Sequence, residues 1–159
     1  MAKIDDAIEL ARREDFLPAL NMFLDIYGTD ESVPLRKPKD ASGLSYFGLC
    51  LALVRKQMKP AIELCRRAVT LEFYNGDHYA NLARVYAAAG NRKKAVEIAE
   101  QGLKLAPEHD YLLEVRKSFG LRSTPAVPFL GRTNPINVSL GHARQAKKAA
   151  PKKAAPRKR

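Results

Sequence analysis

The sequence has no tryptophan, only two cysteines, and no acidic residue after Glu114. It also has no run of 18 consecutive apolar residues, which is the length that a membrane-spanning helix needs. Near the start, Lys3, Asp5 and Asp6 place charges where a signal peptide would have its apolar core. We therefore expect a cytoplasmic protein without a membrane span.

Motifs that carry catalysis are missing as well. There is no Gly-rich phosphate loop and no group of His, Cys and Asp at metal-binding spacing. His78, His109 and His142 fall in different predicted elements, so only the fold could bring them into one site. Cys50 and Cys65 lie in apolar helical stretches and are expected to be buried thiols. We predict a protein that is not an enzyme and has no cofactor or metal.

The charge is distributed unevenly along the chain. The net charge is +11, yet residues 1–115 hold 16 Lys and Arg against 17 Asp and Glu. Residues 116–159 hold 12 basic residues and no acidic one. The first part therefore has the ordinary charge balance of a folded domain, whereas the C-terminal part is strongly cationic.

An internal repeat organises the first part. The segment 61–71 recurs at 95–105, with small or apolar side chains at the steps of three and four that an amphipathic helix requires. A third copy at 19–26 precedes the segment at 61 by a longer interval, which equals the first displacement plus an insertion of eight. Prolines and charges at 28–41 indicate that the insertion enlarges a loop between repeats.

Each repeated helix is preceded by another helix, so the sequence predicts three helix pairs and a seventh helix. Gly90 and Asn91 are expected to form the turn inside the third pair, and Asp77 to cap its first helix. Pro107 is expected to open the seventh helix and Gly120 to end it. The predicted helices are 3–14 and 16–27, 42–55 and 58–72, 77–89 and 92–105, and 107–119.

The third pair resembles the tetratricopeptide repeat family in its sequence pattern. The matching residues are Tyr79, Leu82, Ala83, Tyr86, Gly90, Ala95, Ala99, Gly102 and Pro107. The first repeat keeps part of the pattern but has Glu14 where a turn glycine is usual. In the second, Phe47 and Gly48 lie one residue too far from Ala61, so its inner turn is expected to be one residue longer. The resemblance covers residues 3–107.

The resemblance implies a fold and a binding mode. The fold would be a right-handed α-solenoid of three helix-turn-helix repeats, with residues 108–119 as a C-terminal capping helix, in one domain over 3–119. In this family the first helix of each pair lines a concave groove that holds a peptide or helix of a partner protein. The groove positions carried over to this chain are Ile8, Arg12, Tyr46 or Phe47, Ala80, Asn81, Arg84 and Ala87.

Some members of the family hold a C-terminal carboxylate of a chaperone with Lys and Asn side chains. Asn81 and Arg84 lie on the corresponding helix face, but Asp5 and Ile8 stand where that clamp needs cationic or amide groups. We therefore expect Asn81 and Arg84 to be solvated groove residues or contacts to some other ligand. Because a groove position is expected to be solvated in the free protein, Arg84→Glu would weaken partner binding without lowering stability.

Two segments follow the helices. Residues 120–142 combine prolines with large apolar side chains, so they could pack on the end of the repeats or dock onto another protein. Residues 143–159 consist of Ala, Lys, Arg and Pro with one Gln, a composition that forms no core and predicts a disordered tail. Its cations could bind nucleic acid, an acidic protein or anionic lipid, or could simply be solvated. They are Arg144, Lys147, Lys148, Lys152, Lys153, Arg157, Lys158 and Arg159.

Two functions remain open from the sequence. In the first, the chain is an adaptor whose groove holds a protein segment while the basic tail tethers the complex to an anionic surface. In the second, it is associated with nucleic acid, which binds the tail and Arg92, Lys93 and Lys94 without sequence preference, while the repeats form an oligomer.

Overall fold

The computed structural model describes residues 4–28 and 40–120. In these ranges every regular element is helical, with seven α-helices and one short π-helical segment. The elements are α1 (Ile4–Arg12), α2 (Phe16–Tyr27), α4 (Ala41–Cys50), η1 (Leu51–Arg55), α5 (Met58–Leu71), α6 (Gly76–Ala88), α7 (Arg92–Leu105) and α8 (Asp110–Ser118). The predicted all-α class is confirmed for this part of the chain.

The described residues all belong to the first of two units, Met1–Gly120 and Leu121–Arg159. The segment predicted at 120–142, apart from Gly120, and the predicted tail at 143–159 lie outside the described residues.

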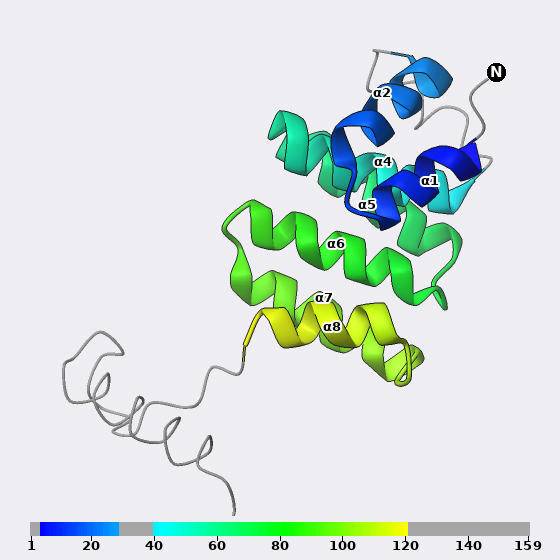
Figure 1. Cartoon of the computed structure of the whole chain (residues 1–159). Helices are drawn as coiled ribbons and strands as arrows, with labels where there is room; N and C mark the ends of the chain where they lie inside the picture. The colour runs from blue at the N-terminus through cyan, green and yellow to red at the C-terminus, as the bar shows by residue number, and fades with distance from the viewer. Residues whose placement is uncertain (1–3, 29–39, 121–159) are drawn as a thin grey trace, which may run out of the picture. The chain divides into compact units, whose positions relative to one another are not determined.

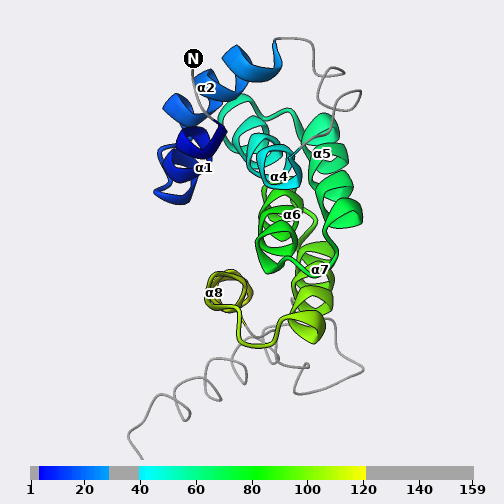
Figure 2. The same cartoon turned by 90° about the vertical axis from the view of Figure 1, so that its right-hand side faces the viewer.

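The helices pack as antiparallel pairs: α1 with α2, α4 with α5, and α6 with α7 (Figure 1). Turns of two or three residues join the two helices of each pair. The first helices contact one another from pair to pair, α1 with α4 and α4 with α6, and α8 packs against both α6 and α7 (Figure 2). None of the described helices is long and apolar enough to cross a membrane.

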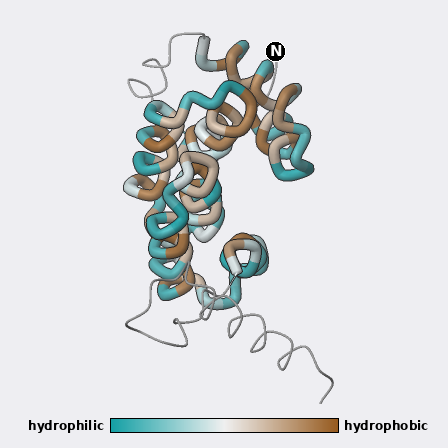
Figure 3. Tube along the Cα trace, turned by 90° about the vertical axis from the view of Figure 1, so that its left-hand side faces the viewer, coloured by the Kyte–Doolittle hydropathy of each residue, from teal (hydrophilic) through white to brown (hydrophobic). Residues whose placement is uncertain are grey.

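Small side chains allow these helices to approach closely. Alanines without exposed surface recur along the interfaces, because a methyl group fills little space between two backbones. They include Ala7, Ala19, Ala61, Ala68, Ala80, Ala83, Ala95 and Ala99. Figure 3 shows apolar and polar stretches alternating along each helix, as expected for helices that bury one side.

The turns inside the three pairs share one backbone feature. Each contains a residue with a positive φ: Glu14 at 66°, Lys56 at 59° and Gly90 at 77°. These three positions are separated by the same two displacements that relate the repeated helices in the sequence. Only the third position is a glycine, for which this conformation has no steric cost. The backbone therefore repeats even where the side chain does not.

The extra residue of the second pair does not lengthen its inner turn, contrary to the sequence prediction. The first helix instead widens into the π-helical segment η1 before the turn at Lys56 and Gln57. The amide of Gln57 reaches back to the carbonyl of Leu51 at 3.2 Å. A π-helical turn accommodates one added residue without shifting the rest of the helix, so α4 and α5 still pack along their length.

Two predicted helix starts are wrong, although the helices exist. Helix α6 is capped by Asn75, whose side chain accepts a hydrogen bond from the amide of Asp77, so Asp77 lies in the first turn. Helix α8 begins at Asp110 rather than at Pro107, with His109 as its cap. Gly120 follows the end of α8 with φ at 65°, as predicted.

Candidate functional site

The structure distributes the predicted groove residues between core and surface. Most of their side chains are buried: Ile8, Tyr46, Phe47, Ala80 and Asn81. Three reach the surface: Arg12, Arg84 and Ala87. We call the surface formed by Arg12, Asp77, Arg84 and Ala87 the first-helix face, because these residues belong to α1 and α6.

One half of this face is organised around the carboxylate of Asp77. Arg12 Nη2 donates to Asp77 Oδ2 at 3.0 Å, and the Tyr46 hydroxyl donates to the same oxygen at 2.9 Å. Arg12 also donates from Nε to the Tyr46 oxygen at 3.2 Å and lies over its ring. His109 Nε2 lies 3.3 Å from Asp77 Oδ1. One carboxylate thus joins α1, α4, α6 and the start of α8.

The tautomer of His109 follows from its two contacts. Its Nδ1 accepts a hydrogen bond from the amide of Leu112, so this nitrogen carries no proton. Nε2 then carries the proton and faces Asp77 Oδ1. The ring lies against Gly76, where an added Cβ would come within 2.5 Å of the imidazole carbons. Gly76 is therefore needed for His109 to reach Asp77.

The other half of the face is organised around Arg84. Its Nη2 donates to Glu14 Oε1 at 2.9 Å, and its Nη1 donates to the Tyr111 hydroxyl at 2.9 Å. The guanidinium lies 5.3 Å from the centre of the Phe16 ring, at a distance typical of a cation–π contact. The side chain of Arg84 is only 21% exposed. The prediction that Arg84 is solvated is therefore wrong.

The hydrogen bonds continue from Arg84 into the core. The Tyr111 hydroxyl donates to Asn81 Oδ1 at 3.0 Å, and Asn81 Nδ2 donates to Ser45 Oγ at 3.0 Å. Asn81 and Ser45 have no exposed surface. Asn81 is thus a buried link between α4, α6 and α8, and the prediction that it is solvated is also wrong.

Burial and hydrogen bonding set the titration of the two tyrosines. Burial raises the pKa of the Tyr46 hydroxyl, outweighing the opposing hydrogen bond from Arg12. Burial likewise raises the pKa of Tyr111, which Arg84 partly opposes. Both hydroxyls therefore stay protonated near neutral pH and act as donors to Asp77 and Asn81.

Sequence reasoning missed four members of these networks: Glu14, Ser45, Tyr111 and His109. The residues that they contact, including Asp77 for His109, lie 27 to 70 residues away in the sequence. No local pattern encodes such distant pairs. The one available signal was Glu14, an acidic residue where the repeat pattern has a turn glycine.

The remaining predicted positions have separate outcomes. Lys94 forms an ion pair with Glu97, and Arg92 and Lys93 are exposed. The eight cations predicted for the tail lie outside the described residues. Cys50 and Cys65 are buried as predicted, and burial raises the pKa of Cys50 to about 12 and that of Cys65 further.

Over residues 4–28 and 40–120, no group of three or more His, Cys, Asp or Glu side chains could hold a metal ion. No family model matches the chain, and no curated protein matches it.

Proposed function

We propose that the chain is a non-enzymatic adaptor of the tetratricopeptide type, a right-handed solenoid of three repeats that is closed by α8 as a capping helix. Three antiparallel pairs support this architecture, because their turns share one backbone conformation and recur at the displacements of the repeated helices. An array of stacked pairs presents its first helices on one continuous surface, which suits the binding of a peptide or helix.

The observation that carries the proposal is the asymmetry of the Glu14–Arg84 ion pair. Arg84 is held from several sides by Tyr111 and Phe16 and is 21% exposed, whereas its partner Glu14 is 65% exposed. Such a fixed guanidinium is pre-organised to receive a carboxylate, and the carboxylate that it now holds belongs to an exposed side chain. A carboxylate of a partner protein can therefore replace that of Glu14.

The test uses a position on the face that carries none of these contacts. Ala87→Glu adds a bulky negative side chain to the first-helix face, and Gln101→Glu adds the same charge to an exposed position of α7. A partner would be captured with the full chain, identified by mass spectrometry, purified, and its affinity measured by calorimetry. We expect Ala87→Glu to weaken binding about tenfold or more and Gln101→Glu to leave it unchanged.

Melting temperatures of both variants close to that of the unmodified chain would show that neither acts by unfolding the protein. Equal affinities of Ala87→Glu and the unmodified chain would place the binding surface elsewhere and contradict the proposal.

The second candidate function is association with nucleic acid through the tail. Residues 143–159 carry eight Lys and Arg and no acid, and a dense polycation binds nucleic acid by releasing its counterions. If it neutralises about 6 to 8 phosphates of duplex DNA, log K should fall with log salt at a slope of roughly −5 to −7. A chain ending at Gly141 should lose this binding. Binding that survived the truncation would exclude the tail as its source.

A further inference from the structure

A second exposed surface lies along α5 and the turn that follows it. Phe73 and Tyr74 are 61% and 67% exposed, and Leu71 beside them is also exposed. The two rings contact each other edge to face, with centroids 5.6 Å apart and planes at 83°. Single exposed apolar residues are common on proteins, but three large ones within four positions form a patch.

The turn is held in a fixed conformation, so the two aromatic side chains are not exposed by fraying. Glu72 Oε2 accepts hydrogen bonds from Asn75 Nδ2 and from His78 Nε2, both at 3.0 Å. The backbone amide of Asn75 donates to the carbonyl of Glu72 at 3.1 Å. Glu72 is thus directed toward the fold, and residues 73 and 74 between these anchors face solvent.

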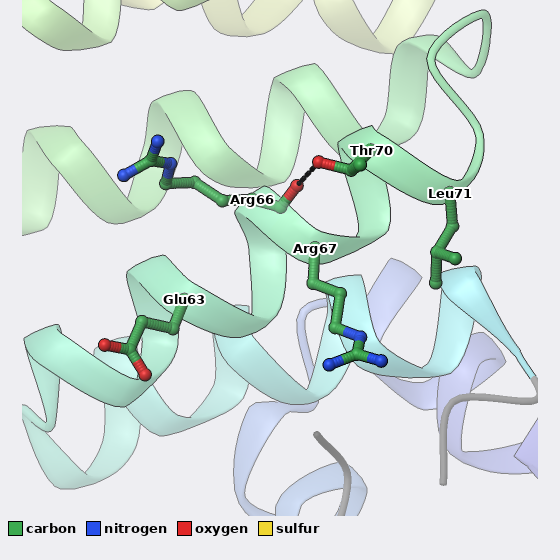
Figure 4. A pocket seen from close by; sticks show the side chains of 5 residues that line it. All are labelled: Glu63, Arg66, Arg67, Thr70 and Leu71. Atoms are coloured by element: carbon green, nitrogen blue, oxygen red, sulfur yellow. Dashed lines mark hydrogen bonds between the residues drawn. The ribbon is translucent and has the colours of Figure 1, made fainter. Parts of the chain in front are cut away.

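Arginines continue the surface along α5. Figure 4 shows Arg66 and Arg67 extending in different directions from the helix. With Glu63, Thr70 and Leu71 they line an open hollow of about 540 Å³. The Thr70 hydroxyl donates a hydrogen bond to the backbone carbonyl of Arg66 at 3.0 Å. We call Arg66, Arg67, Leu71, Phe73 and Tyr74 the α5 surface.

The two arginines of the α5 surface differ from most other arginines of the domain. Four of the others pair with a carboxylate: Arg12, Arg13, Arg84 and Arg116. Among the described residues, Arg66 and Arg67 have no such ion pair, and Glu63 is the one carboxylate in the hollow. The hollow therefore has an excess of positive charge, and the exposed rings of Phe73 and Tyr74 follow its last residue, Leu71, in the chain.

The charge of the α5 surface indicates which kind of ligand it can bind. The tail of this chain carries only cations, so the α5 surface would repel it. A second copy that presented the same surface would bring arginines against arginines. An anionic ligand with flat apolar groups satisfies both the arginines and the rings, and single-stranded nucleic acid combines these two properties.

We propose that the α5 surface binds single-stranded nucleic acid, with bases stacked on Phe73 and Tyr74 and phosphates paired with Arg66 and Arg67. This site is separate from the first-helix face and does not depend on a protein partner there. It also differs from the tail, because residues 143–159 contain no aromatic residue that could stack on a base. The tail recognises charge alone, whereas the α5 surface requires unpaired bases.

The experiment compares three ligands of defined chemistry with the full chain at 150 mM salt. Fluorescence anisotropy would be measured with a (dT)20 strand, with a 20-residue abasic strand of equal charge, and with a 20-base-pair duplex. Stacking predicts tighter binding of (dT)20 than of the abasic strand. The abasic strand reports on the tail and the arginines without any base to stack, and the duplex buries the faces of its bases.

Substitutions then assign the difference to the α5 surface. Phe73→Ala with Tyr74→Ala should weaken binding of (dT)20 by roughly 5- to 150-fold for each stacked base and leave the abasic strand unaffected. The matched control is Leu17→Ala with Leu105→Ala, two apolar residues of similar exposure at 60% and 52%. Arg66→Gln with Arg67→Gln should reduce the salt slope for (dT)20 by about 1.4, the loss of two phosphate contacts.

Three results would overturn the proposal. One is equal affinity of the unmodified chain for (dT)20 and the abasic strand, which would mean that charge alone is recognised. Another is loss of affinity by the aromatic variant for both strands alike, and the third is no loss for either. A Glu-rich peptide that bound in an aromatic-dependent manner while (dT)20 did not would make the surface a protein-docking site instead. Circular dichroism would show whether each variant keeps its helical fold.

Discussion

Glu14 and Arg84 lie 2.9 Å apart although 70 residues separate them in the chain. Glu14 occupies the turn between α1 and α2 with a positive φ, and Arg84 projects from α6. Their ion pair connects the first helix pair to the third. Because Tyr111 also bonds to Arg84, the same guanidinium holds α8 in place.

Arg84→Ala should therefore lower stability, contrary to the expectation from the sequence. The substitution removes two hydrogen bonds and the contact with the Phe16 ring, and leaves the half-buried Tyr111 hydroxyl with one partner fewer. We expect a loss of about 1–3 kcal/mol in the free energy of unfolding, measured by urea denaturation. A loss within experimental error would mean that these contacts do not stabilise the fold.

Arg13→Ala is the matched control. Arg13 forms an ion pair with Glu9 one helical turn away, and both side chains are largely exposed. Pairs of this kind stabilise a helix by about 0.3–0.5 kcal/mol. A larger loss in the free energy of unfolding for Arg84→Ala than for Arg13→Ala would show that an arginine connecting several helices stabilises the fold more than one in a surface ion pair within a single helix.

Substituting Asn81 should lower the stability of the protein more than substituting a surface asparagine. Asn81→Leu removes the bonds to Ser45 and Tyr111 and leaves the buried Ser45 hydroxyl without this donor. We expect about 2–4 kcal/mol of destabilisation, since each unsatisfied buried polar group costs roughly 1–3 kcal/mol. Asn21→Leu on the exposed side of α2 is the control. Thermal denaturation of both variants would show whether the bridge is needed.

The helices could be predicted because their signal is local. The repeated steps of three and four, the turn at Gly90 and the stop at Gly120 each depend on residues close together in sequence. The hydrogen-bond networks could not be predicted from the sequence, because the role of Asn81 depends on Ser45 and Tyr111, which belong to other helices. The π-helical segment η1 was not predicted from the sequence, for a related reason. Sequence spacing shows that one residue is added, but packing decides where it is absorbed.

Ala95 gives a direct test of the packing between α6 and α7. It has no exposed surface, so Ala95→Glu would bury a carboxylate without a partner and cost several kcal/mol. Ala88→Glu places the same side chain at an exposed position in the last turn of α6, where the helix dipole makes an acid unfavourable by about 0.3–1 kcal/mol. Similar melting temperatures for the two variants would contradict the placement of Ala95 in the core.

His78 should make the stability depend on pH. Its side chain has no exposed surface, Nε2 lies 3.0 Å from Glu72 Oε2, and Nδ1 has no hydrogen-bond partner among the described residues. Burial lowers the pKa of His78 below its usual 6.5, although Glu72 opposes this shift. The folded protein therefore keeps His78 neutral at a pH where the unfolded chain already binds a proton.

The sign of the effect follows from this difference in proton binding. Below about pH 6.5 the unfolded state gains a proton that the folded state lacks, so the free energy of unfolding falls as the pH falls toward the folded pKa of His78. The slope cannot exceed about 1.4 kcal/mol per pH unit for one group. Glu72 acts in a lower window, because the hydrogen bond from Asn75 lowers its pKa below 4.5. The stability that ionised Glu72 contributes is lost only as the pH falls from 4.5 toward the folded pKa of Glu72.

The variant His78→Gln distinguishes the pH range in which His78 affects stability from the lower range in which Glu72 does. Glutamine does not titrate, so urea denaturation of this variant should show a smaller slope just below pH 6.5 and keep the loss that begins below pH 4.5. In the unmodified protein, NMR titration of the His78 ring should give a midpoint below 6.5. A midpoint above 6.5 would mean that the Glu72 carboxylate outweighs burial. The stability of the unmodified protein would then be lost as the pH rises through that midpoint.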